Sequence, residues 1–327
     1  MRNFLINDRM ALLEIRNLAV DFETKQSTTR AVRNVFLTLQ NGETHCVVGE
    51  SGCGKSVSAF AAMGLIEKPG KITNGEIIFN GRDLRKIDED EYRKIRGKEI
   101  SMIFQDPMNS LNPVYSCGDQ ISETLTNHAE ISKKEALAEA ARVLDLVKVP
   151  FAQKRLMQYP HELSGGLRQR VMIAAAIICK PKLLIADEPT TALDVTVQKE
   201  ILNLLYDLQK EMGMAILFIT HDLGIVRRIA DKISVLYAGE VIESGTSNDI
   251  FSSPKHPYTN GLLDAIPKIG AKREKLKPIY GSLPDPSKEI SFCAFEPRCP
   301  KSGEICRSKK PPTNDINGHC FRCFEAK

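Results

Sequence analysis

Thr44–Ser56 reads Thr-His-Cys-Val-Val-Gly-Glu-Ser-Gly-Cys-Gly-Lys-Ser, an apolar run followed by a glycine-rich turn. Its last eight residues, Gly49–Ser56, match the pattern G-x-x-x-x-G-K-[ST] at every fixed position. The apolar run predicts a buried strand over 44–48, and the composition of 55–66 predicts a helix directly after the turn. Ordinary residue frequencies make a chance match rare, roughly 0.01 per chain of this length, and the strand–turn–helix context makes it rarer still.

The chemistry of this turn follows from its residue types. Glycines allow backbone N–H groups to curl around phosphate oxygens, and the start of a helix adds partial positive charge. Lys55 is expected to reach the β- and γ-phosphates, and the Ser56 hydroxyl is expected to bind Mg²⁺. The sequence therefore predicts a site for ATP and Mg²⁺, and its expected contacts are Gly49, Glu50, Ser51, Gly52, Cys53, Gly54, Lys55, Ser56 and Val57.

The rest of the chain alternates between strand and helix patterns, which indicates a parallel α/β core. The expected strands and helices are strands within 12–48 and 75–105, a helical stretch over 119–180, a strand at 182–187, a helix at 195–212, a strand at 214–220, a helix at 222–230 and a hairpin at 232–243. The helical stretch is an insert between the first helix and the second core strand. After residue 251 prolines become frequent, which predicts a tail of loops and short elements.

The composition of the 327 residues is ordinary for a soluble globular protein, with 42% apolar and 26% charged residues. The net charge of +4, from 45 basic and 41 acidic residues, is too small to indicate a nucleic-acid partner. The sequence contains no run of 18 uncharged apolar residues that would cross a membrane, and residues 1–9 lack the apolar centre of a signal peptide. We therefore expect a cytosolic chain with reduced thiols.

Two acidic residues end the apolar strand Leu183–Asp187. The carboxyl ends of parallel strands are where α/β sheets bind ligands. Asp187 is expected to hold Mg²⁺, and Glu188 is placed to polarise the water that attacks the γ-phosphate. Two acids that merely end a strand are the plainer alternative, and only the phosphate loop in the same chain favours the catalytic interpretation.

A second phosphate-binding pattern lies at Leu163–Arg170, which reads Leu-Ser-Gly-Gly-Leu-Arg-Gln-Arg. Ser-Gly-Gly at the start of a helix offers free N–H groups and a hydroxyl to an anion. A chain with one phosphate loop has no use for a second, so this helix start is expected to serve the nucleotide of another subunit. An ordinary helix start capped by Ser164 is the alternative.

With these motifs in order, the sequence resembles an ATP-binding subunit of an ABC transporter over residues 12–250. The resemblance also rests on Gln105 after the strand Met102–Phe104, on Ala192-Leu193-Asp194, and on His221 within Ile219–Asp222. It implies a P-loop NTPase fold with a RecA-like core, an antiparallel β subdomain and a helical subdomain at about 106–180, within a nucleotide-binding domain spanning 1–250. The family works as a head-to-tail dimer with two ATP molecules at the interface.

The resemblance also implies roles for single residues. Ser164, Gly165 and Gly166 would contact the γ-phosphate held by the partner, and Asp194 would lie at the dimer interface. His221 would contact the γ-phosphate of its own subunit, and Gln105 would touch Mg²⁺ or the water and link the site to the membrane subunits. Lys55 and Glu188 complete the catalytic set. Phe22 resembles the aromatic residue that stacks on adenine, with a core phenylalanine as the alternative, because Phe36 lies in the same region.

Three further phrases resemble the dipeptide/oligopeptide importer branch, namely Phe104–Pro113, Tyr159–Gly166 and Lys255–Thr259. The branch implies that ATP hydrolysis powers peptide import at the cytoplasmic face of the cell membrane. Its partners would be a second ATPase subunit, in a heterodimer or homodimer, two transmembrane permease subunits and an extracytoplasmic peptide-binding protein. Val57 is typical of the first of the two ATPase subunits. Relatives that carry nickel leave the cargo open.

The sequence departs from this branch at two positions, Leu167 in place of Met and Cys53 in place of Ser. The first exchange conserves volume, and the second predicts sensitivity to thiol reagents.

ABC ATPases that transport nothing are the other class. Repair proteins insert a long coiled coil, whereas Ser56 and Ser164 are only 108 positions apart. Translation factors carry two cassettes in a chain, and this chain carries one. A redox sensor built on an inactive ATPase is disfavoured by the complete catalytic set.

Five of the nine cysteines fall within the last 35 residues, at positions 293, 299, 306, 320 and 323. Thiolates in a loop-rich tail suggest that a metal holds it together. A [4Fe–4S] cluster, structural zinc with His319 as a further ligand, and disulfides or free thiols are the three alternatives. By resemblance to the extension of the importer branch, the ligands would be Cys293, Cys299, Cys306 and Cys323, with Cys320 as the alternative fourth. We expect a linker and extension over 251–290 and a metal-binding tail over 291–327.

Overall fold

The structure is a computed structural model that describes residues 10–106, 110–191, 193–266 and 278–326. The chain divides into two compact units, and each is described by itself. Unit 1 takes in the chain up to residue 40, residues 44–85 and the chain from residue 219 onward. Unit 2 takes in residues 41–43 and 86–218.

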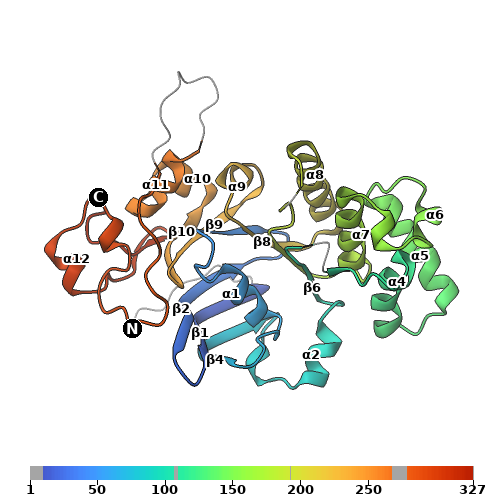
Figure 1. Ribbon diagram of the computed structural model, residues 1–327, viewed down its shortest axis with the longest axis horizontal. Helices are drawn as coiled ribbons and strands as arrows, with labels where there is room; N and C mark the ends of the chain where they lie inside the picture. Colours follow the sequence, from blue (N-terminus) through green and yellow to red (C-terminus); the bar gives the residue numbers. More distant parts are fainter. Residues whose placement is uncertain (1–9, 107–109, 192, 267–277, 327) are drawn as a thin grey trace. The chain divides into compact units, whose positions relative to one another are not determined.

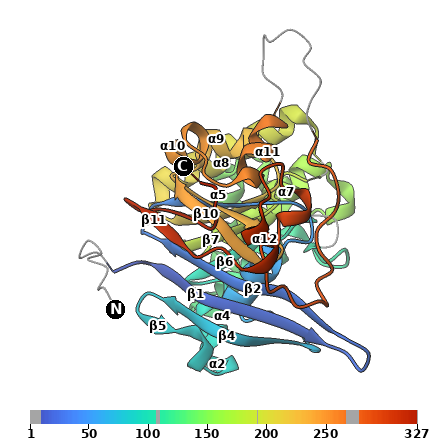
Figure 2. The same cartoon turned by 90° about the vertical axis from the view of Figure 1, so that its left-hand side faces the viewer.

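Unit 1 contains an antiparallel sheet made of β1 (Leu13–Glu23), β2 (Thr28–Leu39), β4 (Gly70–Phe79) and β5 (Arg82–Asp83). β1 pairs with β2 on one side and with β4 on the other, and these three strands lie side by side in Figure 2. Asn80 and Gly81 join β4 to β5 with φ values of 49° and 80°. Two positive φ values match a tight turn between antiparallel strands, the conformation that an Asn-Gly pair favours.

Unit 1 also contains the strand of the phosphate loop, β3 (Thr44–Val48), whose five residues are all buried. β3 pairs in parallel with β9 (Lys232–Tyr237), and β9 turns back into β10 (Glu240–Thr246). Ala238 and Gly239 form that turn with φ values of 49° and 80°, which confirms the predicted hairpin. A buried parallel pair matches the near-continuous apolar sequence of both strands.

Helices complete unit 1. They are α1 (Lys55–Ala62), α9 (Leu223–Ile229), α10 (Ser247–Ser252), α11 (Pro257–Asp264) and α12 (Glu304–Ser308), with short 3-10 turns at Leu84–Lys86 and Glu296–Arg298. The predicted loops and short elements after residue 251 are present, but the tail also adds strands to the sheet. β11 (Asn314–Ile316) and β12 (His319–Phe321) form a hairpin, and β12 pairs with β10.

Unit 2 groups four helices, α4 (Cys117–His128), α5 (Lys133–Leu146), α6 (Ala152–Leu156) and α7 (Gly165–Ile177), which lie together in Figure 1. Its strands include β6 (Ile100–Ile103) and β7 (Leu183–Asp187), which pair in parallel. The strand β8 (Ala215–Thr220) begins in unit 2, and its last two residues belong to unit 1. The long helix α8 (Val195–Met212) begins at an Asp194 cap and ends at Gly213, whose φ is 65°. The helix predicted over 195–212 is confirmed.

One expected element is wrong. The stretch 75–105, expected to hold only strands, contains the helix α2 (Glu89–Ile95). The Asp88 side chain accepts a hydrogen bond from the Glu91 N–H, and three acidic residues occupy the first turn. These are the features that start a helix and stabilise its positive end.

Among the described residues, none of the helices is both long enough and apolar enough to span a lipid bilayer.

Candidate functional site

The phosphate loop connects β3 to α1 within unit 1, as its sequence predicts. Gly52 and Gly54 have φ values of 81° and 102°, which suit glycine. A Cβ on Gly54 would lie 2.6 Å from the Ala31 carbonyl oxygen, so any larger residue would push the loop away from β2. Ser51 and Gly52 are exposed, while Gly49 is buried. The local sequence therefore fixes a turn that other residue types would distort.

Lys55 is the buried cation of this loop, with 5% of its surface exposed. Its Nζ donates to the carbonyl oxygens of Gly49 at 2.8 Å and Glu50 at 2.9 Å. The ammonium group is therefore held inside the curve of the loop. Ser56 and Val57 follow it as half-buried residues of the first turn of α1.

Cys53 is less accessible than its position in the phosphate loop suggests. Its side chain is fully buried, and burial raises the pKa of its thiol above the ordinary value. Only a thiolate reacts readily. The structure therefore gives no support to the predicted sensitivity to thiol reagents.

The candidate adenine contact, Phe22, and the nearby Phe36 lie in neighbouring strands of unit 1. Phe22 is half-buried near the end of β1, opposite Thr29 and Gly70. Phe36 in β2 lies under the Arg322 guanidinium, whose Cζ is 5.6 Å from the ring centroid. Phe36 thus contacts a residue of the tail, while Phe22, also half-buried, is the candidate for stacking on adenine.

Also in unit 1, His221 directly follows β8 and is exposed. The next residue, Asp222, starts α9 by accepting hydrogen bonds from the N–H groups of Gly224 and Ile225. His221 is thus held at a fixed point between a strand and a capped helix.

In unit 2 the expected catalytic carboxylate and glutamine meet. Glu188 Oε2 accepts hydrogen bonds from Gln105 Nε2 at 3.2 Å and from Thr191 Oγ1 at 3.0 Å. The contact follows from topology, because Gln105 and Glu188 come just after the paired parallel strands β6 and β7. Glu188 has a φ of 44°, a left-handed conformation that is uncommon for glutamate and typical of functional sites. Asp187 is the buried last residue of β7.

Ser164 and its two glycines begin α7 in unit 2. Ser164 and Gly165 are exposed, and among the described residues no N–H group of the first turn donates to the Ser164 hydroxyl. The hydroxyl does not act as the ordinary cap that the alternative requires. Gly166 is needed for packing as well, since a Cβ there would lie 2.9 Å from Val197 Cγ1 of α8.

Asp194 has a visible structural task. Its Oδ1 accepts hydrogen bonds from the Thr196 and Val197 N–H groups, both at 3.0 Å, at the start of α8. The side chain is exposed. Capping of α8 by Asp194 is compatible with its predicted place at a dimer interface.

Four of the five tail cysteines come together in unit 1. Cys293, Cys299, Cys306 and Cys323 line one small pocket, together with His256 and Phe295. Burial raises the pKa of Cys293 to about 11. Among the described residues, no group of three or more ligating side chains is arranged for a single metal ion.

The fifth cysteine and the neighbouring histidine lie elsewhere. The Cys320 thiol donates to Asp315 Oδ2 at 3.2 Å, and His319 Nε2 donates to the buried Glu243 at 2.8 Å. Neither residue lines the cysteine pocket. The structure therefore brings together the four cysteines that resemblance selected and leaves out both Cys320 and His319.

Two residues that sequence reasoning missed contact the phosphate loop. Tyr258 in α11 and Arg298 in the tail both bind Glu50, through its N–H group and its carboxylate respectively. Tyr258 stands in the phrase Lys255–Thr259, which resembles the importer branch, but nothing in that phrase indicates a contact with residue 50.

Known proteins match this chain along most of its length. Residues 32–191 match the ABC transporter family, and residues 242–306 match the family described as "Oligopeptide/dipeptide transporter, C-terminal region". The oligopeptide transport ATP-binding protein OppD of Escherichia coli (strain K12) is 50% identical over 96% of this chain and 93% of its own length. The dipeptide transport ATP-binding protein DppD of Bacillus subtilis (strain 168) is 47% identical over 96% and 94%.

Among solved structures, a dimeric ATP-binding cassette in a post-hydrolysis state with ADP and Pi is similar. Its TM-score is 0.64 and its sequence identity 28%, over 72% of this chain and 98% of that chain. The two matched regions contain the phosphate loop, Gln105, Glu188 and the tail as far as residue 306. The chain belongs to the ABC ATPases of the oligopeptide/dipeptide importers.

Proposed function

We propose that this chain binds ATP and Mg²⁺ and hydrolyses ATP to power the import of peptides through an ABC transporter. The observation that carries the proposal is similarity along 96% of the chain to peptide-transport ATPases, tail region included. Its partners would be a second ATPase subunit, two transmembrane permease subunits and an extracytoplasmic peptide-binding protein. It would work at the cytoplasmic face of the membrane.

The proposed roles divide between the units. In unit 1, the loop 49–57 holds the phosphates, Lys55 and Ser56 serve the β- and γ-phosphates and Mg²⁺, His221 contacts the γ-phosphate, and Phe22 stacks on adenine. In unit 2, Asp187 and Gln105 serve Mg²⁺, and Glu188 takes the proton of the attacking water. Gln105 and Thr191 support this role, because both donate to Glu188 and so orient its carboxylate.

The second half of the proposal is dimerisation. Ser164, Gly165 and Gly166 would bind the γ-phosphate of the partner's nucleotide, and Asp194 would lie at the interface. The exposed Ser164 hydroxyl supports this role, because it is not engaged in capping its own helix. ATP binding then joins two subunits, and hydrolysis separates them.

The test is Glu188→Gln, which removes the base but keeps the shape of the side chain. We expect ATPase activity to fall by about 100-fold or more, the range typical of a lost general base. ATP binding should persist, and a dimer should accumulate with ATP and Mg²⁺ in size-exclusion chromatography. Glu211→Gln, at an exposed glutamate near the end of α8, is the matched control. Wild-type turnover in Glu188→Gln would contradict the assignment.

We further propose that Cys293, Cys299, Cys306 and Cys323 hold a [4Fe–4S] cluster. Support comes from the donor set, since four thiols line one pocket and thiolates are the ligands that hold such clusters. Bound there, a cluster would tie four positions of the tail together and supply structural stability.

Metal analysis of anaerobically purified protein tests this proposal. We expect iron with broad visible absorption that bleaches on reduction. Cys323→Ser should lose most of the iron, while Cys320→Ser should keep it, because the Cys320 thiol is bonded to Asp315 instead. Stoichiometric zinc without iron, or equal loss in both variants, would contradict the cluster or its ligand set.

A further inference from the structure

Glu50 is the second residue of the phosphate loop, and three of its groups are held. Its N–H donates to Tyr258 Oη at 3.1 Å. Its carbonyl oxygen accepts from Lys55 Nζ at 2.9 Å. Its carboxylate accepts two hydrogen bonds from the Arg298 guanidinium, at 3.0 and 3.1 Å. Two of these partners, Tyr258 and Arg298, belong to the C-terminal extension, which lies more than 200 positions away in the sequence.

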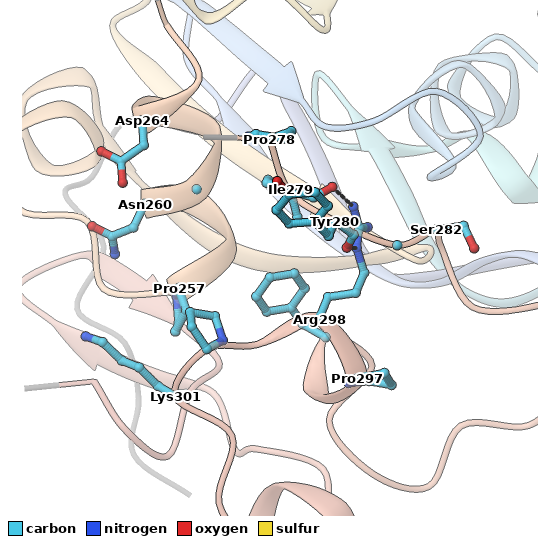
Figure 3. Close-up of a pocket in the computed structure, with 14 residues that line it drawn as sticks. Pro257, Asn260, Asp264, Pro278, Ile279, Tyr280, Ser282, Pro297, Arg298 and Lys301 are labelled. Atoms are coloured by element: carbon cyan, nitrogen blue, oxygen red, sulfur yellow. Dashed lines mark hydrogen bonds between the residues drawn. The ribbon is translucent and has the colours of Figure 1, made fainter. Parts of the chain in front are cut away.

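Several contacts other than the one with Glu50 hold the Arg298 side chain in place. Only 5% of its side chain is exposed. It donates to the carbonyl oxygens of Tyr280 at 2.9 Å and Ile279 at 3.2 Å, and to Tyr237 Oη at 3.3 Å. Figure 3 shows the guanidinium beside the backbone of Ile279 and Tyr280. A side chain that several contacts already hold in place loses little conformational entropy when it binds a carboxylate.

Aromatic packing joins the same residues to the cysteine pocket. Phe295 lies edge-on to Tyr237 and Tyr258, with centroids 5.3 and 5.4 Å apart. Phe295 also lines the cysteine pocket, and Cys299 follows Arg298 directly in the chain. The tail therefore contacts the phosphate loop through a continuous set of packed side chains rather than through a flexible linker.

A second segment of the extension lies along the same edge of unit 1. The Arg30 N–H donates to the Pro286 carbonyl at 3.0 Å, and the Arg33 guanidinium donates to the carbonyls of Pro286 and Lys288. Gly52 of the phosphate loop and residues 283–286 line one further pocket. The extension thus lies near the loop at Gly52 as well as at Glu50.

We infer that Arg298 and Tyr258 are positioning residues for ATP, acting through Glu50 of the phosphate loop. The inference rests on the proposed function, because it concerns the same nucleotide site. Without Arg298, the negative charge of the Glu50 carboxylate would no longer be paired with a guanidinium. The carboxylate would then repel the negatively charged phosphates of ATP in the same loop. Without either residue, Glu50 would move, and the Lys55 ammonium would lose a fixed partner.

The test measures steady-state ATPase kinetics and ATP binding in the purified full-length protein. Arg298→Met should raise the KM for ATP by roughly tenfold or more, while kcat changes by less than about threefold, because ground-state binding is lost and the chemical groups are untouched. Tyr258→Phe removes only the bond to the Glu50 N–H and should raise KM by a smaller factor.

A double variant separates positioning from general damage. Glu50→Gln combined with Arg298→Met removes both charges, so no carboxylate is left unbalanced. We expect its KM to lie nearer the wild-type value than that of Arg298→Met alone. Arg142→Ala is the matched control, since Arg142 makes the same two-bond contact with Glu139 on the exposed surface of α5. Its KM and melting temperature should be those of the wild type.

The outcomes are distinct. Wild-type protein that neither binds nor hydrolyses ATP would overturn the proposed function itself. Wild-type activity together with an unchanged KM in folded Arg298→Met would overturn this inference alone. It would also be overturned by a double variant whose KM is higher than that of Arg298→Met alone, or by a fall in kcat with constant KM, because either result would place Arg298 outside ATP positioning.

Discussion

His45, the second residue of β3, carries an imidazole that is 1% exposed in the interior of unit 1. Its Nδ1 lies 3.2 Å from the Thr38 carbonyl oxygen, and its Nε2 lies 2.8 Å from Ser234 Oγ. A carbonyl oxygen only accepts, so Nδ1 carries the proton and Nε2 accepts from the serine hydroxyl. Both ring nitrogens are therefore satisfied in the neutral form of the imidazole.

Burial lowers the pKa of His45 from 6.5 to about 4, with a smaller contribution from Lys232 and an opposing one from the Thr38 hydrogen bond. Below pH 6.5 the His45 side chain is protonated in the unfolded chain, but in the folded chain it stays neutral until the pH falls to about 4. Folding stability is therefore full above pH 6.5 and is lost as the pH falls toward 4. This single group accounts for a loss of about 3 kcal/mol across that window.

His45→Gln tests this prediction, because glutamine keeps one donor and one acceptor but does not titrate. Between pH 5 and 6, the slope of the free energy of unfolding against pH should fall by about 1.4 kcal/mol per pH unit relative to wild type. Urea titrations at half-unit intervals measure it, and the value at pH 7.5 gives the cost of the altered hydrogen bonds alone. An unchanged slope would mean that His45 is protonated inside the fold.

At the scale of elements, the sequence was sufficient to predict the helices and turns that depend on residues close together in the chain. The β9–β10 hairpin and α8 follow from a tight-turn pair and from a capped, periodic helix. The helix α2 was missed because it has only seven residues and lies between strands, so its Asp88 cap was the only strong signal. The pairing of β12 with β10 was missed because sheet neighbours distant in sequence leave no local pattern.

The same distinction holds in the candidate site. The Gln105–Glu188 contact was predictable in kind, because both residues follow strands whose carboxyl ends share one edge. The gathering of Cys293, Cys299, Cys306 and Cys323 came from resemblance, since spacing alone fits several metals. The Arg298–Glu50 ion pair joins residues 248 positions apart. No periodicity, cap or turn rule relates two such positions, so only the folded chain reveals the pair.

At the scale of the whole molecule, Glu243 in β10 connects three parts of unit 1 that are distant in sequence. The side chain is fully buried. Its carboxylate accepts hydrogen bonds from the N–H groups of Lys255 and His256 at 2.6 and 2.9 Å, before α11, and from His319 Nε2 at 2.8 Å, in β12. One residue of the core sheet therefore anchors both α11, which carries Tyr258, and the final strand of the tail.

Glu243→Ala should consequently lower the free energy of unfolding by about 3 kcal/mol, because three donors, two of them on the buried residues His256 and His319, lose the carboxylate that accepts from them. Glu243→Gln keeps one acceptor oxygen and should lose less. Urea denaturation measures both, and limited proteolysis should cut within 278–326 sooner than elsewhere, since β12 and α11 lose their common anchor. Glu304→Ala, at an exposed glutamate of α12, is the control and should stay within about 0.5 kcal/mol of wild type. Equal stability of Glu243→Ala and this control would mean that the tail is held by its apolar contacts alone. A selective loss of the tail would identify Glu243 as the point at which the extension depends on the ATPase core.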